Sequence, residues 1–429
     1  MIPIIRYETE DGKKIVKQIL SRSQLEHENV QEIVDEILTD VRKNGDKAVF
    51  NYTKQFDKID IDASCIKVSR EEIEYAYTQV SEDLIRVIRR AATRIKDFHQ
   101  KQKINSWFEP SPNGEILGQL IRPLENVGVY VPGGKAAYPS SVIMNVIPAH
   151  VAGVKNIYMT TPAQKDGSVY PTTIVAAVEA GVTEIFKIGG AQAIAALAYG
   201  TESVPKVDKI CGPGNIFVAL AKRTVYGHVN IDSVAGPSEI LIIADSSANA
   251  QFVAADMLSQ AEHDELASAI LITTDEKLAQ EVQLEIEKQT AVLERKEIIE
   301  KSINNFGAII VVDTIEEACD ISNGIAPEHM ELCTSSPFEL LPLVQNAGAI
   351  FMGHYSPEPL GDYMAGPNHV LPTGGTARFF SPLSIDDFIK KSSIISFSKN
   401  ALLALQDDLI DFANAEGLTA HANAVRVRK

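Results

Sequence analysis

The sequence predicts an α/β protein with two Rossmann-like parallel-sheet units and helical extensions at the N-terminal and C-terminal ends. Three observations predict this fold class. Short apolar segments recur from Val127 onward, Gly or Pro turns follow them, and segments with helical periodicity separate them. Because strands that alternate with helices form parallel sheets, the pattern predicts sheets that helices cover on both faces.

Residues 1–121 are expected to form a helical region that packs on the second α/β unit. Apolar residues recur at helical spacing between Val30 and Val41, and Asn44-Gly45 ends this pattern. A second helix is predicted over residues 71–101, and the Pro and Gly residues at 109–118 indicate a junction.

Residues 122–236 are expected to form the first unit and residues 237–382 the second, with the join at Val234–Pro237. The strands predicted for the first unit are Val127–Val131, Ile157–Thr160, Ile185–Ile188 and Lys209–Cys211. Those predicted for the second unit are Ile240–Ala244, Ala269–Thr273, Ala308–Val312, Met330–Cys333 and Ala349–Met352. The similar rhythm of strands and helices suggests two related folds.

Residues 383–429 are predicted to be helical, with little indication of a sheet. An apolar stripe that includes Leu405 and Phe412 needs a surface to pack on. That surface belongs either to the same chain or to a second subunit.

The composition bounds the class of protein. Hydrophobic residues make up 45% of the 429 residues, and the formal net charge is −17. An acidic surface argues against a nucleic acid or an anionic membrane as partner, and no apolar run approaches the length of a membrane span. The four cysteines lack metal-site spacing, and the start of the chain lacks a signal peptide, so a reduced, cytoplasmic protein is expected.

Three Gly-rich segments follow predicted strands of the first unit: Tyr130–Gly134, Gly189–Leu197 and Gly212–Asn215. Ligands of open α/β sheets bind in a crevice at the carboxyl ends of the strands. The segments lack the G-x-G-x-x-G fingerprint, so either cofactor contact or tight packing of strand on helix explains the glycines. Gln192 favours ligand contact, whereas Asn215 is either a helix cap or a polar contact to a ligand.

The second unit contains residues of catalytic and ligand type. Gln260 and His263 lie three residues apart on a predicted helix, so both reach one common point, although a solvated helix face is the simpler explanation. Glu328 and His329 suit proton transfer near neutral pH. Neighbouring residues of a strand point to opposite faces, so the pair enters one pocket only from a loop, which Pro327 favours.

A polar loop is predicted at Gly361–His369, where Asp362 is a candidate oxygen ligand and His369 a competing candidate. Ser238 either caps a turn or contacts a substrate. The segment Glu416–His421 ends in a histidine that is either an exposed surface residue or part of a site.

These residues lie in segments that closely resemble the histidinol dehydrogenase family. The resemblance extends over nearly the whole chain, from Phe56-Asp57 to Arg426. The matching segments are Val129–Gly134, Gly189–Gly200, Gly212–Asn215, Ala235–Glu239, Leu258–His263, Ala326–Glu331, Gly361–Pro372 and Glu416–His421. A short motif arises by chance, but this ordered set is much harder to obtain that way.

The resemblance implies an NAD-dependent L-histidinol dehydrogenase that converts L-histidinol to L-histidine through L-histidinaldehyde, with two NAD⁺ and one Zn²⁺ per subunit. It implies zinc ligation by Gln260, His263, Asp362 and His421, and acid/base catalysis by Glu328 and His329. Substrate contacts are expected from the zinc ligands with Ser238, His329 and Glu416, and NAD contacts from Tyr130, Gln192 and Asn215. The C-terminal segment is expected to complete the site of the other subunit in a homodimer.

Three other functions remain as alternatives. A paralogue with the same fold and zinc would oxidise another small alcohol, but the presence of Glu416 and of the Glu328-His329 pair argues against it. A zinc hydrolase would use Glu328 to activate water without a cofactor, and the three Gly-rich strand ends argue against that. The third alternative is a small-molecule binding protein without catalytic activity.

Overall fold

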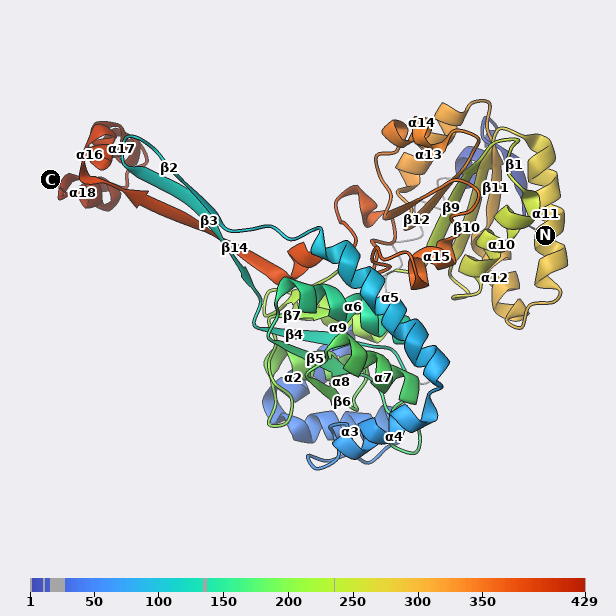
Figure 1. The fold of residues 1–429 in the computed structure, drawn as a ribbon, viewed down its shortest axis with the longest axis horizontal. Coiled ribbons are helices and arrows are strands. Elements are labelled where there is room, and N and C mark those ends of the chain that lie inside the picture. Colours follow the sequence, from blue (N-terminus) through green and yellow to red (C-terminus); the bar gives the residue numbers. More distant parts are fainter. Residues whose placement is uncertain (1, 11, 16–27, 134–136, 235, 429) are drawn as a thin grey trace.

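The computed structural model describes residues 2–10, 12–15, 28–133, 137–234 and 236–428. Two α/β units lie next to each other, and a long antiparallel arm leads from them to the C-terminal helices (Figure 1). Both α/β sheets are parallel, so the predicted fold class is confirmed. Among the described residues, no helix combines the length and the apolarity of a membrane span.

The first unit has a five-stranded parallel sheet in the order β6-β5-β4-β7-β8. Its strands are β4 (Asn126–Tyr130), β5 (Asn156–Thr160), β6 (Glu184–Phe186), β7 (Lys209–Cys211) and β8 (Asn230–Ile231). The helices between them are α6 (Pro139–Ala152), α7 (Pro171–Ala180), α8 (Gly190–Tyr199) and α9 (Ile216–Val225). The chain winds outward from β4 in both directions, and the carboxyl edge between β4 and β7 is therefore the switch point where such sheets bind ligands.

The second unit repeats this order in β11-β10-β9-β12-β13, and β1 (Ile4–Arg6) adds a sixth parallel strand beside β11. Its strands are β9 (Glu239–Ala244), β10 (Ser268–Thr273), β11 (Ala308–Val311), β12 (His329–Cys333) and β13 (Ala349–Met352). Its helices are α10 (Ala250–Ala261), α11 (Glu276–Thr290), α12 (Lys296–Phe306), α13 (Ile315–Ile325), α14 (Pro337–Leu340) and α15 (Glu358–Tyr363). Short 3₁₀ turns are η2 (Leu341–Leu343), η3 (Thr376–Arg378) and η4 (Ile385–Phe388). The shared strand order agrees with the two related folds that the sequence suggested.

The strand β9 shows why these segments are recognisable in the sequence. Ile240 and Ile242 pack in one apolar cluster, and Leu241 and Ile243 pack in another on the opposite face of the sheet. Helices cover both faces, so the strand is a continuous apolar run with no polar alternation.

The prediction that the N-terminal helices pack on the second unit is wrong. These helices are α2 (Glu28–Asn44), α3 (Asp46–Asp57), α4 (Arg70–Gln79) and α5 (Glu82–Gln100), and they pack on the helices of the first unit. Val34 of α2 shares an apolar cluster with Leu197 of α8, and Ile95 of α5 shares one with Val146 of α6. The helix expected over residues 71–101 is divided, because the Ser81 hydroxyl caps the start of α5 at the Leu84 N–H.

The prediction that residues 383–429 are helical is also wrong in part. The strand β14 (Ile389–Phe397) pairs antiparallel with β3 (Glu115–Pro123), and β2 (Trp107–Pro110) pairs with the other side of β3. Most residues of β14 are exposed, so the strand has neither a buried run nor an apolar alternation in its sequence. Beyond it come the helices α16 (Lys399–Ala404), α17 (Gln406–Ala415) and α18 (Thr419–Arg426), at the tip of the arm (Figure 1).

A short connection joins the two units. The last strand of the first sheet, β8, ends at Ile231, and the next strand along the chain, β9 of the second sheet, begins at Glu239. A connection of seven residues therefore holds the carboxyl edge of the first sheet near the amino edge of the second. Within it, the Gly236 N–H donates to Thr373 Oγ1 at 2.6 Å. Ala235, like Gly134 of the first Gly-rich loop, lies outside the described residues.

Candidate active site

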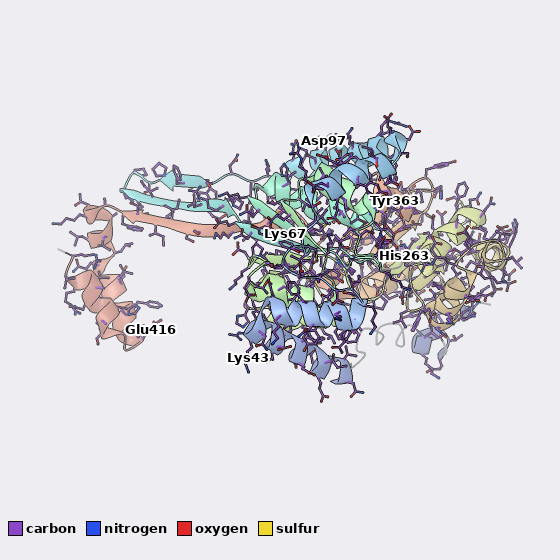
Figure 2. All side chains as sticks on the ribbon, turned by 90° about the horizontal axis from the view of Figure 1, so that it is seen from below. Lys43, Lys67, Asp97, His263, Tyr363 and Glu416 are labelled. Atoms are coloured by element: carbon purple, nitrogen blue, oxygen red, sulfur yellow. The ribbon has the colours of Figure 1, made fainter. Side chains whose placement is uncertain are left out.

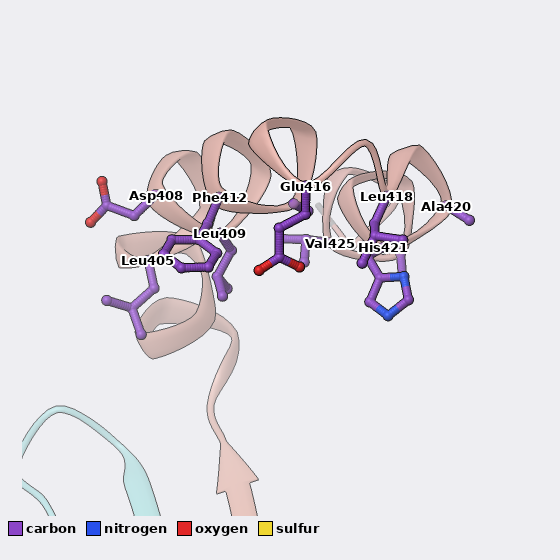
Figure 3. A pocket seen from close by; sticks show the side chains of 11 residues that line it. Leu405, Asp408, Leu409, Phe412, Glu416, Leu418, Ala420, His421 and Val425 are labelled. Carbon is purple, nitrogen blue, oxygen red and sulfur yellow. The ribbon is translucent and has the colours of Figure 1, made fainter.

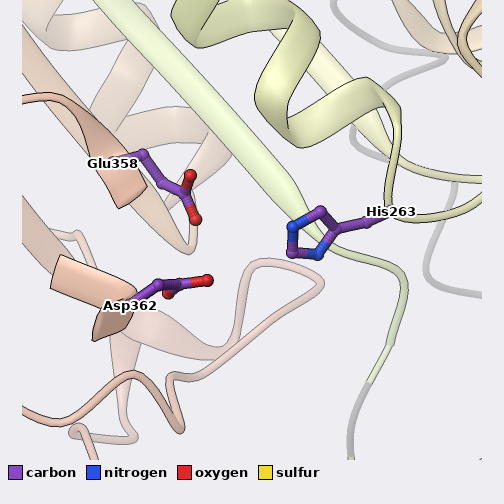
Figure 4. Close-up of side chains that lie close together, drawn as sticks. All are labelled: His263, Glu358 and Asp362. Carbon is purple, nitrogen blue, oxygen red and sulfur yellow. The ribbon is translucent and has the colours of Figure 1, made fainter. Parts of the chain in front are cut away.

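Three side chains with metal-ligand chemistry converge at the amino edge of the second sheet. Ligand atoms of His263, Glu358 and Asp362 all lie within 4.8 Å of one another (Figure 4). Glu358 and Asp362 occupy positions i and i+4 of α15, which places both carboxylates on one face of that helix. His263 comes from the turn after α10, and its ring faces the two carboxylates (Figure 4).

Gln260, whose backbone carbonyl accepts from the His263 N–H, is a further candidate donor. Its side chain is completely buried, and neither atom of its amide group has a hydrogen-bond partner in the described part of the chain. A buried amide without partners is costly unless something else satisfies it. One amide oxygen, one imidazole and carboxylates form a donor set that fits Zn²⁺ or a similar divalent cation, so these residues fit the expected metal.

The helix that was expected to present Gln260 and His263 on one face ends earlier than predicted. Gln260 lies in the last turn of α10, which ends at Ala261, and His263 lies beyond it. The His263 N–H still donates to the Gln260 carbonyl at 3.2 Å, so the two residues remain neighbours. His263 is exposed in the single chain, in contrast to Gln260 and Glu358.

Glu328 and His329, the expected acid/base pair, lie side by side at the amino end of a strand. Glu328 precedes β12 and His329 is its first residue, so the expected loop position holds for Glu328 alone. The backbone of Glu239 holds both side chains: its N–H donates to Glu328 Oε2 at 2.9 Å, and its carbonyl lies 3.0 Å from His329 Nδ1. Since a carbonyl only accepts, Nδ1 bears the proton and Nε2 is the free basic nitrogen.

The free nitrogen of His329 lies close to the cluster of His263, Glu358 and Asp362. Its Nε2 lies 3.8 Å from Glu358 Oε1, and it is buried without a hydrogen-bond partner among the described residues. Ser238, which is half-buried, immediately precedes β9 at the same edge of the sheet. The predicted residues His263, Asp362 and His329 therefore lie close together within a single chain, and Gln260 is linked to His263 through a backbone hydrogen bond.

Burial acts on the pKa of four ionisable groups at this site. It lowers the pKa of His329 to about 4 and raises the pKa of Glu328 well above its ordinary value. Burial and then the neighbouring Asp362 raise the pKa of Glu358 to about 9. Burial also acts to raise the pKa of Asp362, but hydrogen bonding and charge from His369 outweigh it and hold that pKa at about 2.

Sequence reasoning missed Glu358 and left the role of His369 open. The available indication for Glu358 was its i, i+4 spacing to Asp362, but the segment Gly361–His369 was interpreted as a loop and α15 is only six residues long. His369 Nδ1 lies 3.5 Å from Asp362 Oδ1, so this histidine orients the carboxylate.

The residues expected to contact a dinucleotide lie at the carboxyl edge of the first sheet. The Gly190 N–H, at the start of α8, donates to the Tyr130 hydroxyl at 3.2 Å. Gln192 is buried, and neither atom of its side-chain amide has a partner among the described residues, which fits a polar ligand such as NAD. Asn215 Oδ1 caps α9 by accepting from the Phe217 and Val218 N–H groups, which leaves its amide NH₂ for a ligand.

Glu416 and His421 lie far from the other candidate residues of the same chain. They belong to the helices at the tip of the arm, and Figure 2 shows Glu416 and His263 in separate parts of the molecule. They line an apolar pocket of 830 Å³ that includes Leu405, Leu409, Phe412, Leu418 and Val425 (Figure 3). Glu416 and His421 project to the same side of these helices (Figure 3). The single chain thus separates His421 from Gln260, His263 and Asp362.

Comparisons with known proteins agree on one family. The family model for histidinol dehydrogenase matches residues 20–429. The chain is 56% identical over 428 residues to histidinol dehydrogenase of Caldanaerobacter subterraneus subsp. tengcongensis, and 55% identical over 428 residues to that of Clostridium acetobutylicum; each alignment covers 100% of this chain and 99% of the relative. The crystal structure of histidinol dehydrogenase from Elizabethkingia anophelis is 40% identical with a TM-score of 0.94, and the match covers 100% of this chain and 98% of that one.

Proposed function

This chain belongs to the histidinol dehydrogenase family, and from that premise we propose that it oxidises L-histidinol to L-histidine through L-histidinaldehyde with two NAD⁺ and one zinc ion per subunit. The observation that carries the proposal is the convergence of His263, Glu358 and Asp362 next to the free nitrogen of His329. A cytoplasmic biosynthetic enzyme with a small-molecule substrate fits the acidic charge and the four free cysteines, three of which are buried.

Zinc would be held by Gln260, His263 and Asp362 from one subunit and by the partner subunit's His421. When bound, the metal would orient the imidazole and the amine of histidinol and polarise its oxygen. The unpartnered amide of Gln260 and the carboxylate of Asp362, ionised at neutral pH, support this ligand set. Glu358, which is buried with a pKa of about 9, would remain protonated beside the ionised Asp362.

The first oxidation needs a base for the alcohol proton. His329 would accept it at Nε2, because Nδ1 is committed to the Glu239 carbonyl. Burial keeps this imidazole neutral at neutral pH, so it is ready to accept a proton. NAD⁺, held near Tyr130, Gln192 and Asn215, would supply the hydride acceptor for each oxidation.

The second oxidation needs water at the aldehyde carbon. Glu328 would remove a proton from that water, which adds to the aldehyde to form the hydrate, and oxidation of the hydrate gives the carboxylate. The carboxyl group accepts the Glu239 N–H through Oε2, and this bond fixes its position 3.7 Å from the His329 ring nitrogen. Ser238 at the same edge would contact the substrate.

A homodimer would complete the site. The partner subunit's His421 and the partner subunit's Glu416 would reach the metal and the substrate, with the arm spanning the distance between subunits. Two features support this arrangement: the ligand His263 is exposed in the single chain, and the C-terminal helices present an apolar pocket that contains both polar residues. Apolar surface of this kind is buried when subunits associate.

The proposal is tested with purified, zinc-replete protein and histidinol as substrate. We expect two molecules of reduced nicotinamide and one molecule of histidine per histidinol, followed by absorbance and by amino-acid analysis. Turnover of other small alcohols with no turnover of histidinol would indicate a paralogue. Zinc-dependent hydrolysis of a small-molecule substrate in the absence of NAD would indicate a zinc hydrolase. Binding of histidinol without turnover in the metal-replete dimer would indicate a binding protein.

A further inference from the structure

A buried ion pair holds the loop that follows β7. Lys222, on α9, pairs with Asp232, the residue after β8, and their side chains are only 3% and 5% exposed. Lys222 Nζ also donates to the Gly212 carbonyl at 2.9 Å, and the Gly212 N–H donates to Asp232 Oδ2 at 2.7 Å. Both polar groups of the Gly212 backbone are therefore bonded to the two members of this ion pair.

Gly212 is seated where no other residue fits. Its φ angle is +112°, and a Cβ atom there would lie 2.0 Å from the carbonyl oxygen of Tyr130. The loop that begins at Gly212 therefore packs closely against the end of β4 on one side and is hydrogen-bonded to the ion pair on the other. The next residues lead directly to Asn215, which caps α9.

The energetics of this ion pair argue for a role other than stabilising the fold. A buried ion pair often stabilises a fold no more than apolar residues of the same volume, because both charges lose their hydration. Lys222 also cannot bind a phosphate group itself: its ammonium group is buried and is already bonded to Asp232 and to Gly212. The pair acts on its surroundings through the backbone of one loop.

We propose that Lys222 and Asp232 are positioning residues that fix the Gly212–Asn215 loop in the conformation that binds the dinucleotide. The inference rests on the proposed function, which places NAD at Tyr130, Gln192 and Asn215. The ion pair lies beneath the loop and ties together β7, β8 and α9, so the loop is preorganised before the ligand arrives. Without the pair, the loop samples other conformations, and binding must select the competent one.

The test compares NAD binding by the wild-type protein and by the variants Lys222→Met and Lys222→Met/Asp232→Asn. The double variant removes both charges and keeps an acceptor for the Gly212 N–H, so it remains informative where the single variant fails to fold. We expect the Kd of NAD, measured by calorimetry, to rise by about tenfold, as for the loss of a hydrogen bond to a charged group. The KM of histidinol and the zinc content should change by less than about twofold.

The control is an ion pair whose lysine is buried and lies on β7, the strand that leads into the loop, while the side chain of its partner Asp387 is 27% exposed. Lys209, the first residue of β7, lies 2.8 Å from Asp387 and its side chain is 2% exposed. The variant Lys209→Met/Asp387→Asn is expected to lower the thermal stability but to keep the Kd of NAD. Folded Lys222 and Asp232 variants with unchanged NAD affinity would overturn the inference, as would an equal loss of affinity in the control. A wild-type protein that binds no NAD would overturn the proposed function as well.

Discussion

The division of labour between Glu328 and His329 is best tested by Glu328→Gln. The glutamine carbonyl can still accept the Glu239 N–H, so we expect the local structure to persist. His329 keeps its own bond to the Glu239 carbonyl at 3.0 Å, and it lies 3.7 Å from Glu328, beyond direct hydrogen bonding. The substitution therefore removes a base for water and leaves the base for the alcohol in place.

The expected magnitude differs between the two oxidations. Loss of one proton-transfer group slows a step by about 10²–10⁴-fold, or about 2.7–5.5 kcal/mol in activation free energy. We expect aldehyde oxidation to fall by this factor and alcohol oxidation to fall by less than about tenfold. Because burial penalises the ionised carboxylate of Glu328, the neutral glutamine should not lower the melting temperature at neutral pH.

The assay counts reduced nicotinamide per histidinol in the presence of an aldehyde-trapping amine. The wild-type protein should approach two, and the variant should approach one with trapped aldehyde as the product. In the wild-type protein, aldehyde oxidation should accelerate as pH rises, because burial raises the pKa of Glu328 and its basic form appears at higher pH. Glu276→Gln, at an exposed ion pair with Arg6, serves as the control. An equal loss in both half-reactions would refute the assigned roles.

Three further predictions follow from the same structure. His263→Asn and Asp362→Asn should each lower the zinc content of purified protein by metal analysis, whereas His354→Asn, at a half-buried histidine outside the cluster, should retain it; full zinc occupancy in the first two would contradict the ligand set. Mixing inactive His421→Asn and His263→Asn chains should restore roughly a quarter of the wild-type activity, since random pairing makes half of the dimers mixed, each with one complete site; no recovery in confirmed mixed dimers would refute a shared site. Burial raises the pKa of Asp57 from 3.8 to about 6, so ionisation of this carboxyl group destabilises the folded state as the pH rises through this window. The variant Asp57→Asn should therefore raise the free energy of unfolding by about 1 kcal/mol at pH 7, after a discount for partial solvent exposure, and should leave it unchanged at pH 3. Denaturant unfolding at the two pH values measures this difference.

The sequence predicted the strands of both sheets where they are buried on two faces. In β9, Ile240–Ile243 pack against helices on either side, so the run is apolar throughout and is visible without any knowledge of its partners. The strand β14 was not predicted, because it pairs in an exposed arm and residues such as Lys390 and Ser392 give no periodic apolar pattern.

The residue types of the candidate site could also be predicted from the sequence, but the residues that lie next to them in space could not. His329 and Asp362 are chemically conspicuous, whereas Glu358 lies in a helix of six residues, too short for periodicity to indicate. Its place beside His263 depends on how α15 meets the end of α10, which is a long-range contact.

The chain alone determined what each segment is: which stretches are apolar enough to be sheet strands, where glycine permits a close backbone approach, and which side chains can bind a cation or transfer a proton. Those properties are local, since they depend on side-chain chemistry and on spacing along a few residues. Only the tertiary structure decided which unit the N-terminal helices cover and that residues 389–397 extend an arm away from the body. It also decided that His421, in α18 at the tip of the arm, lies far from the candidate ligands His263 and Asp362 of its own chain. An apolar stripe indicates that a helix packs on another surface. Because the free energy of burial is non-directional, the stripe does not identify which surface that is.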